Sequence, residues 1–306
     1  MIRRGATHSG SWGRGGVTVL LLAPFFALFL AVTLIPIGYA IYLSLFREQA
    51  GGLGFGGTSQ VFSGIANYAR ALADPAYQAG FLVTATYCLL YIPLMLCAAL
   101  GLALLIDSTL ARARRFFQLA LFLPHAVPGV IAALVWVYLY TPGISPVVGA
   151  LNGIGVPVDF LGAGGALPSV VNIAIWEWTG YNMVIFYAAL QAIPRELLEA
   201  ARLDGASGAR VALSVKVPLI RPSLVLTGLF TVIGSLQLFT EPMILHRSAP
   251  AVISTWTPNM YAYGAAFDRS DYGLAAAASV LLAVAAAVLS FVITRFGAGR
   301  AGRSTA

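Results

Sequence analysis

Charged side chains are scarce in this chain. Only 9% of its 306 residues are Asp, Glu, Lys or Arg, against about 25% in an ordinary soluble domain. Apolar residues make up 59%, and the mean hydropathy is +0.85. The composition excludes a conventional soluble domain. We therefore expect an all-α integral membrane protein, because helices satisfy their own backbone hydrogen bonds in lipid.

Cysteine and histidine are also rare. Cys88 and Cys97 lie in one apolar run, and His8, His125 and His246 are far apart, so we expect no disulfide framework and no metal site. His125 fits either a helix-packing residue or a lining residue beside the break at Pro124. The motifs G-x-x-x-x-G-K-S/T, G-x-S-x-G and H-E-x-x-H are missing from the sequence. We expect no catalytic residue and no cofactor bound by this chain.

Long apolar runs are what the sequence does have. A spanning helix needs roughly 20 mostly apolar residues. Six stretches qualify, the first of them with a bend expected at Pro24 or Pro36. They are 17–46, 81–106, 116–140, 168–193, 218–245 and 272–294.

The distribution of basic residues predicts the orientation. With the N-terminus in the cytoplasm, fourteen of the eighteen Lys and Arg residues lie on the cytoplasmic side and four lie outside. We expect a multi-pass protein of the cytoplasmic (inner) membrane, with cytoplasmic tails 1–16 and 295–306 around a six-helix domain, 17–294. The net charge of +7 then indicates contact with lipid headgroups and not with nucleic acid.

The cytoplasmic loop 194–218 is unusually charged. Good helix formers follow Pro194, and Asp204-Gly205 is a stop signal in which Gly205 suits a left-handed cap. A second short helix is expected to start near Ser207 and to end before Pro218. Composition alone allows an amphipathic helix that links two spans, or an element that docks on a partner.

The same loop resembles a known signature. The loop contains Glu199-Ala200-Ala201, then Gly205 after three residues, and then Val215-Lys216-Val217-Pro218 after nine more. This pattern is similar to the EAA loop of membrane subunits of binding-protein-dependent ABC importers. Val215 replaces Ile and Val217 replaces Leu. The chain also resembles the maltose and glycerol-phosphate branch of this family, in particular the first partner of its heterodimeric pairs. The residues that carry this further resemblance are Asn67-Tyr68 with Asp74-Pro75 and Thr84-Ala85-Thr86, Phe122-Leu123-Pro124, and 190–194.

The resemblance implies a type I importer permease with a coupling helix between its fourth and fifth spans. Its implied partners are a dimer of ATP-binding subunits, which carry ATP and Mg²⁺, a second permease chain, an extracytoplasmic solute-binding protein and membrane lipid. The residues expected to couple to the ATP-binding subunit are Glu196, Glu199, Ala200, Ala201, Arg202, Asp204, Gly205 and Pro218.

Polar residues inside the fourth and fifth spans are candidates for the substrate pathway, because charged groups in lipid are costly. They are Trp176, Glu177, Trp178, Tyr181, Asn182, Gln237 and Glu241. Carboxylates and amides suit sugar hydroxyls, and aromatic rings suit the apolar faces of a sugar. The alternative for the aromatic residues is an interfacial belt, and for the amides it is helix packing.

The missing cations narrow the choice of substrate. Apart from Arg221, close to the cytoplasmic end of 218–245, no Lys or Arg falls inside a predicted span, which favours a neutral sugar over glycerol phosphate. A membrane enzyme would need a cluster of His, Asp or Glu at one membrane face. An ion-driven secondary transporter would show inverted repeats, and neither feature is visible.

Overall fold

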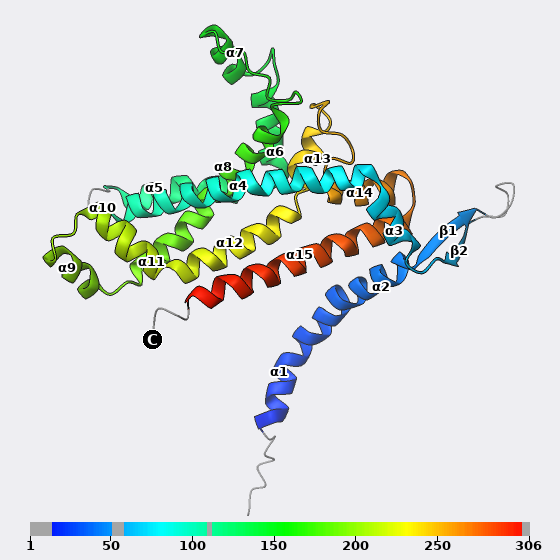
Figure 1. Cartoon of the computed structure of the whole chain (residues 1–306), viewed down its shortest axis with the longest axis horizontal. Helices are drawn as coiled ribbons and strands as arrows, with labels where there is room; N and C mark the ends of the chain where they lie inside the picture. Colours follow the sequence, from blue (N-terminus) through cyan, green and yellow to red (C-terminus); the bar gives the residue numbers. More distant parts are fainter. Residues whose placement is uncertain (1–13, 51–57, 109–111, 302–306) are drawn as a thin grey trace, which may run out of the picture.

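The computed structural model describes residues 14–50, 58–108 and 112–301. Four helices, α4, α8, α12 and α15, run side by side (Figure 1). At one end, here called the loop end, lie α9 and α10; at the other, the hairpin end, lie β1, β2 and α3 (Figure 1). The helices and strands are α1 (Arg14–Phe29), α2 (Ile35–Ser44), β1 (Phe46–Ala50), β2 (Thr58–Phe62), α3 (Ala66–Ala73), α4 (Pro75–Asp107), α5 (Arg114–Phe122), α6 (Gly129–Tyr140), α7 (Pro146–Gly153), α8 (Ala166–Gln191), α9 (Arg195–Leu203), α10 (Gly208–Val211), α11 (Val217–Leu219), α12 (Arg221–Leu236), α13 (Thr240–Leu245), α14 (Pro258–Tyr263) and α15 (Tyr272–Ala301).

The all-α membrane fold is confirmed, but the six predicted spans are not equivalent. Four helical segments of the described chain are long and apolar enough to cross a membrane, and a fifth qualifies as a bent pair. They are Thr18–Ser44, Pro75–Asp107, Arg221–Leu245, Tyr272–Arg295 and the pair Arg114–Ala126 with Gly129–Tyr140. The predicted fourth span is α8, whose 26 residues give it the length. α8 is not among the segments apolar enough to qualify, in keeping with its polar residues, and half of its residues are buried by protein.

The third predicted span, 116–140, is bent and not straight. The segments Arg114–Ala126 and Gly129–Tyr140 meet at 94°. Pro128 removes a backbone donor, and Val127 before it adopts the extended conformation that a following proline favours, with φ −78° and ψ 129°. α6 consequently leaves the line of the bundle (Figure 1).

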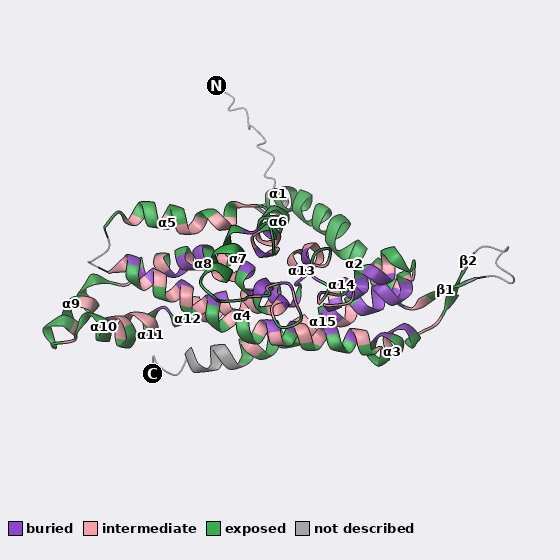
Figure 2. Cartoon of the chain, turned by 90° about the horizontal axis from the view of Figure 1, so that it is seen from above, coloured by how far each residue is buried: buried purple, intermediate pink, exposed green. Residues whose placement is uncertain are grey.

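The core is centred on the contact between α4 and α8. Met95, Ala99 and Ala103 of α4 are fully buried, as are Met183 and Phe186 of α8. Small residues let helix backbones approach closely in lipid, where dispersion replaces the hydrophobic driving force. Figure 2 shows burial concentrated in these central helices, while α1 and α5 remain largely exposed.

Gly180 permits an especially close approach. A Cβ at this position of α8 would lie 1.7 Å from the carbonyl oxygen of Leu121 in α5. No side chain fits there without moving one helix. The bent third span is therefore seated on α8 at a position that requires glycine.

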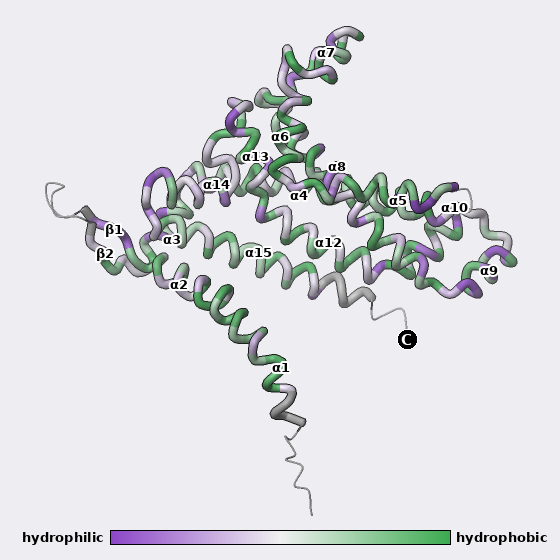
Figure 3. The backbone as a smooth tube through the Cα atoms, turned by 180° about the vertical axis from the view of Figure 1, so that it is seen from behind, coloured by the Kyte–Doolittle hydropathy of each residue, from purple (hydrophilic) through white to green (hydrophobic). Residues whose placement is uncertain are grey.

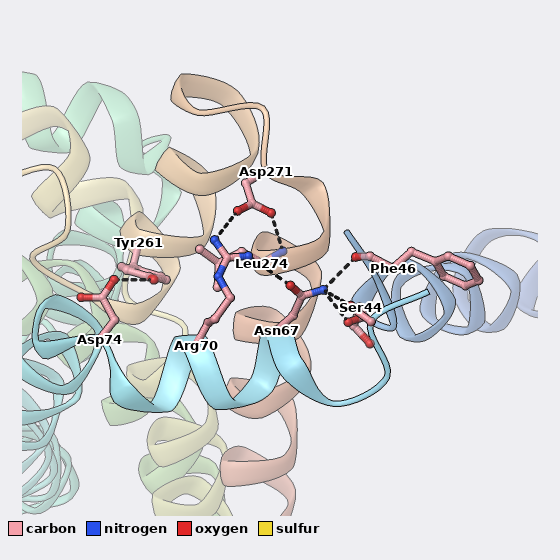
Figure 4. Close-up of polar contacts among 9 residues, drawn as sticks. Ser44, Phe46, Asn67, Arg70, Asp74, Tyr261, Asp271 and Leu274 are labelled. Atoms are coloured by element: carbon pink, nitrogen blue, oxygen red, sulfur yellow. Dashed lines mark hydrogen bonds and ion pairs between the residues drawn. The ribbon is translucent and has the colours of Figure 1, made fainter. Parts of the chain in front are cut away.

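The hairpin end is held by a polar cluster that we call the clasp: Ser44, Asn67, Arg70, Asp74, Tyr261 and Asp271 (Figure 4). The buried amide of Asn67 donates to the carbonyl oxygens of Ser44, at 2.9 Å, and Phe46, at 2.7 Å. Arg70 donates to the Asn67 side-chain oxygen and forms an ion pair with Asp271 at 2.8 Å. α3 thereby joins the end of the first span to the start of the last.

The second part of the clasp joins α4 to α14. Asp74 accepts a hydrogen bond from the backbone of Ala76 and so caps α4, and it also accepts one from the Tyr261 hydroxyl at 2.7 Å. Burial, and then the adjacent Asp74 carboxylate, raise the pKa of Tyr261 to about 12. Asn67 and Asp74, which belong to the pairs Asn67-Tyr68 and Asp74-Pro75 that carried the resemblance in sequence, are therefore both members of the clasp.

The first span stands apart from the bundle. Every residue from Val19 to Tyr39 is exposed in the isolated chain. A π turn at Leu30–Leu34 precedes α2, and Pro36 lies in the first turn of that helix. The glycine-rich tract 51–57, the tail residues 1–13 and residues 302–306 lie outside the described residues, and α15 continues past position 294 to Ala301.

Candidate functional site

The charged loop forms a helix, a turn and a second helical segment at the loop end. α9 covers Arg195–Leu203 with Pro194 as its N-cap. Gly205 has φ +82°, which confirms the left-handed cap. The backbone N–H of Ala206 closes the helix end on the carbonyl of Ala201 at 3.0 Å. Ser207 then caps α10 through the N–H of Arg210.

This segment is almost free of contact with the bundle. No residue of α9 is buried, and seven of the eight predicted coupling residues are exposed, with Ala201 intermediate. Hydrophilic residues gather on α9 (Figure 3). Leu203, which sequence reasoning did not single out, is 90% exposed, an unusual state for a leucine beside a charged turn. The structure thus leaves a charged helix on which two leucines, Leu197 and Leu203, are also exposed.

The exit from this loop differs from the expectation that a helix ends before Pro218. The chain continues through a π turn, Ala212–Lys216, into α11, where Pro218 lies in the first turn. The N–H of Val217 reaches back to the carbonyl of Ala212. This wider turn accommodates the proline ring without ending the helix. Pro36 in the first span follows a π turn in the same way.

A cavity of about 220 Å³ lies between α4, α8 and α12. Five predicted pathway residues line it: Trp178, Tyr181, Asn182, Gln237 and Glu241. Trp178 and Tyr181 are each 38% exposed, while Asn182 is buried and donates to the Trp178 carbonyl at 2.9 Å. The structure therefore brings residues of two predicted spans, about 60 positions apart, around one space.

The other two predicted pathway residues do not line this cavity. Trp176 packs its ring edge against Trp136 of α6, with centroids 5.8 Å apart. Glu177 is buried, and one of its carboxylate oxygens lies 3.6 Å from where a Cβ of Gly129 would be. Both residues therefore face the bent third span. The prediction that they contact substrate is left without a geometric argument in its favour.

His125 supports the cavity wall from behind. Its ring lies 4.6 Å from that of Trp178 and 4.5 Å from that of Tyr181, measured between centroids. Of the two interpretations from sequence, the geometry matches helix packing, because His125 contacts two aromatic rings of α8 and is not among the described residues that line the cavity. The bend in the third span thus fixes the position of two cavity aromatics.

Sequence reasoning missed several lining residues. They are Tyr87, Tyr91, Phe230, Thr231, Gly234, Ser235, Leu238, Phe239 and Thr240. Tyr87 and Tyr91 are buried and stacked, with centroids 5.1 Å apart. Their i,i+4 spacing within the apolar second span was a usable signal. The hydroxyl residues of α12 gave no such signal in the sequence, because Ser and Thr side chains also bond to the backbone of their own helix, as those of Thr231 and Ser235 do.

Comparison with known proteins agrees with this geometry. Residues 99–299 match the protein family described as the binding-protein-dependent transport system inner membrane component. The sn-glycerol-3-phosphate transport system permease protein UgpA of Agrobacterium fabrum is 32% identical, with 90% of this chain and 93% of that protein covered. The trehalose transport system permease protein SugA of Mycobacterium tuberculosis is 30% identical, with coverage of 92% and 89%.

A solved structure shares the fold. A chain of a bacterial alginate ABC transporter, crystallised with a periplasmic protein bound to an alginate pentasaccharide, superposes with a TM-score of 0.81 at 21% identity. The superposition covers 94% of this chain and 96% of that one. The sequence matches extend over most of the chain and include the charged loop and the cavity helices. The chain therefore belongs to the inner membrane components of binding-protein-dependent transport systems, the permease subunits of ABC importers.

Proposed function

We propose that this chain forms one half of the translocation pathway of an ATP-driven importer for a neutral carbohydrate. The cavity between α4, α8 and α12 carries the proposal, because it combines aromatic faces with neutral hydrogen-bonding groups. The loop end faces the cytoplasm and the hairpin end faces outward, as the excess of basic residues indicates. Both termini are then cytoplasmic, and the membrane is the inner membrane.

The loop end supplies the connection to ATP. α9 is exposed and ends in the left-handed Gly205, so a cleft on another protein can hold it as a rigid lever. Glu199 and Arg202 provide charges that fix its register, and Leu203 provides an apolar contact. In this proposal a dimer of ATP-binding subunits, which binds ATP and Mg²⁺, holds α9 and a corresponding helix of a second, different permease chain.

The cavity chemistry favours a neutral sugar. Tyr87, Tyr91, Trp178 and Tyr181 present ring faces, and amides and hydroxyls lie among them. Glu241 is the one charged residue among the described lining residues, and none of these is Lys or Arg. A wall with this charge repels a phosphate or carboxylate. The related trehalose permease is consistent with a neutral disaccharide.

Transport of glycerol phosphate is the second candidate. The 32% identity to UgpA favours it. It requires the second permease chain to contribute the cationic side of the pathway. Competition between a neutral disaccharide and glycerol phosphate separates the two candidates directly.

The test is uptake into proteoliposomes that hold the complete complex, with its solute-binding protein outside and ATP within. We expect uptake of a neutral disaccharide such as trehalose, with no inhibition by excess sn-glycerol-3-phosphate. Omission of the ATP-binding subunit should abolish uptake. Uptake that persists on an ion gradient would contradict the importer, and uptake of glycerol phosphate alone would contradict the neutral substrate.

A further inference from the structure

Three residues from separate segments meet at the loop end, just inside the exposed α9. Lys216 and Asp107 form an ion pair in which their side chains are only 12% and 11% exposed. Gln191 donates to the other oxygen of the same carboxylate at 2.6 Å. We call Asp107, Gln191 and Lys216 the carboxylate joint.

Each member of the joint ends an element. Asp107 is the last residue of α4, Gln191 is the last of α8, and Lys216 is the last of the π turn that leaves the charged loop. The charged loop is therefore bounded on its entry side by Gln191 and on its exit side by Lys216. Both boundaries are bonded to one carboxylate on a helix that is remote from the loop in sequence.

The loop has few other attachments to the bundle. From Arg195 to Arg210 no residue is buried, and the first buried residue on the exit side is Val211. α8 is continuous with the loop and moves with it through the peptide chain. α4 packs along α8 but has no covalent connection to the loop, and the joint is the polar contact that ties the end of α4 to both ends of the loop.

α4 is also a wall of the cavity. Tyr91 lies 16 residues before Asp107 on the same continuous helix, which corresponds to about 24 Å along the axis. Tyr87 and Tyr91 both line the cavity. A shift at Asp107 can therefore pass along one continuous helix, which contains Pro93, to the aromatic groups that face the solute.

We infer that the carboxylate joint is the positioning element that transmits movement of the charged loop to α4, and so to the cavity. Desolvated ion pairs contribute little net stability but hold partners in one register. Loss of a single partner would leave a buried charge and would impair folding by itself. The informative change therefore removes both charges together. The inference rests on the proposed coupling of this chain to ATP hydrolysis.

The test follows α4 directly and needs no knowledge of the solute. In the complete reconstituted complex, Cys88 and Cys97 are replaced by serine and Tyr91→Cys supplies a thiol in the cavity wall. Its rate of modification by a methanethiosulfonate reagent is measured at rest and after trapping with ATP and vanadate. We expect a change of about fivefold with the joint intact, and a change below twofold in the double variant D107N/K216M.

Two further variants complete the design. The charge-swapped D107K/K216D should regain most of the trapping-dependent change. The variant R70Q/D271N removes an ion pair of the same kind in the clasp, where side-chain exposure is 41% and 21%, and should keep the full change. If D107N/K216M assembles and keeps the parental change, the joint does not transmit movement. If the intact complex shows neither a change on trapping nor ATP hydrolysis stimulated by the binding protein, the proposed function itself fails.

Discussion

The two ends of the bundle are built in opposite ways. At the hairpin end, the clasp buries an amide and ties together the first span, α3, α14 and α15 with bonds made within the chain. At the loop end, α9 presents charges and a 90% exposed leucine and has no buried residue. One end is complete in the isolated chain, and in the proposed function the other end is completed by a partner.

This contrast separates stability from coupling. Changes in the clasp should lower the free energy of unfolding and leave the ratio of solute transported to ATP hydrolysed unchanged. Changes in α9 should alter the ratio of solute transported to ATP hydrolysed and leave the free energy of unfolding nearly unchanged, because a solvated helix adds little to stability. The predictions below test that separation, from the largest effect to the smallest.

Asn67→Ala should have the largest effect. It removes a buried amide that donates to two carbonyl oxygens and leaves both without that donor, so we expect a loss of about 3 kcal/mol in unfolding free energy. Denaturant titration of the purified chain in detergent measures it. Asn152→Ala, at an exposed position of α7, is the matched control and should change stability by less than about 0.5 kcal/mol. Equal losses of unfolding free energy in the two variants would show that the clasp does not stabilise the hairpin end.

Gly205→Asp should leave membrane insertion and assembly intact and reduce transport per ATP roughly tenfold. The position has φ +82°, where a side chain costs about 1–2 kcal/mol, and the new charge adjoins Asp204. Coupled uptake and ATP hydrolysis in proteoliposomes measure the ratio. Gly208→Asp adds the same charge three residues away at ordinary φ and should retain most of the coupling. A parental ratio in Gly205→Asp would show that α9 is not the lever.

Gln237→Leu should lower the maximal transport rate about fivefold, because an amide in the cavity lining is replaced by an apolar side chain of similar size. The KM should stay near the parental value, since the solute-binding protein determines it in this proposal. Uptake at saturating and at limiting solute distinguishes the two parameters. Gln60→Leu, on the exposed hairpin and outside the cavity, is the control. A changed KM with an unchanged maximal rate would contradict the assignment.

Tyr261→Phe should have the smallest effect at neutral pH, about 1.5 kcal/mol for a hydrogen bond to a carboxylate. The pKa of Tyr261 is raised from 10 to about 12, so its neutral form is favoured in the folded state. The contribution of this hydrogen bond to the free energy of unfolding is complete below pH 10 and is lost as the pH rises from 10 to 12. The free energy of unfolding, measured over this pH range, should fall as the pH rises in the parent and should fall less in Tyr261→Phe. Identical slopes would show that the hydroxyl is not held by Asp74.

The sequence predicted the loop end better than the cavity, for physical reasons. The charged loop depends on local signals, and the left-handed Gly205 lies where helix-stop chemistry places it. The 94° bend in the third span depends on Pro128 and on the seat that Gly180 offers to Leu121, a contact between residues far apart in sequence. Apolar composition alone did not distinguish that span from a straight one.

The cavity shows the same limit. Trp178 and Asn182 were found because polar groups in an apolar run are conspicuous, whereas Tyr87 and Tyr91 resemble ordinary interfacial aromatics. Which face of α8 meets the cavity depends on its packing against α4, and that packing places Glu177 toward Gly129 instead. Periodicity gives the faces of a helix but not the identity of its neighbours.

The exposed first span has a consequence for how the protein is made. It is translated before the segments that hold it, because the amide that fixes its end belongs to Asn67 and the helix that receives α2 is α15, which begins at Tyr272. The first span must therefore remain in the bilayer, inserted and undocked, while more than two hundred further residues are translated. Its largely apolar surface suits it to that interval, because lipid alone satisfies it until α15 arrives.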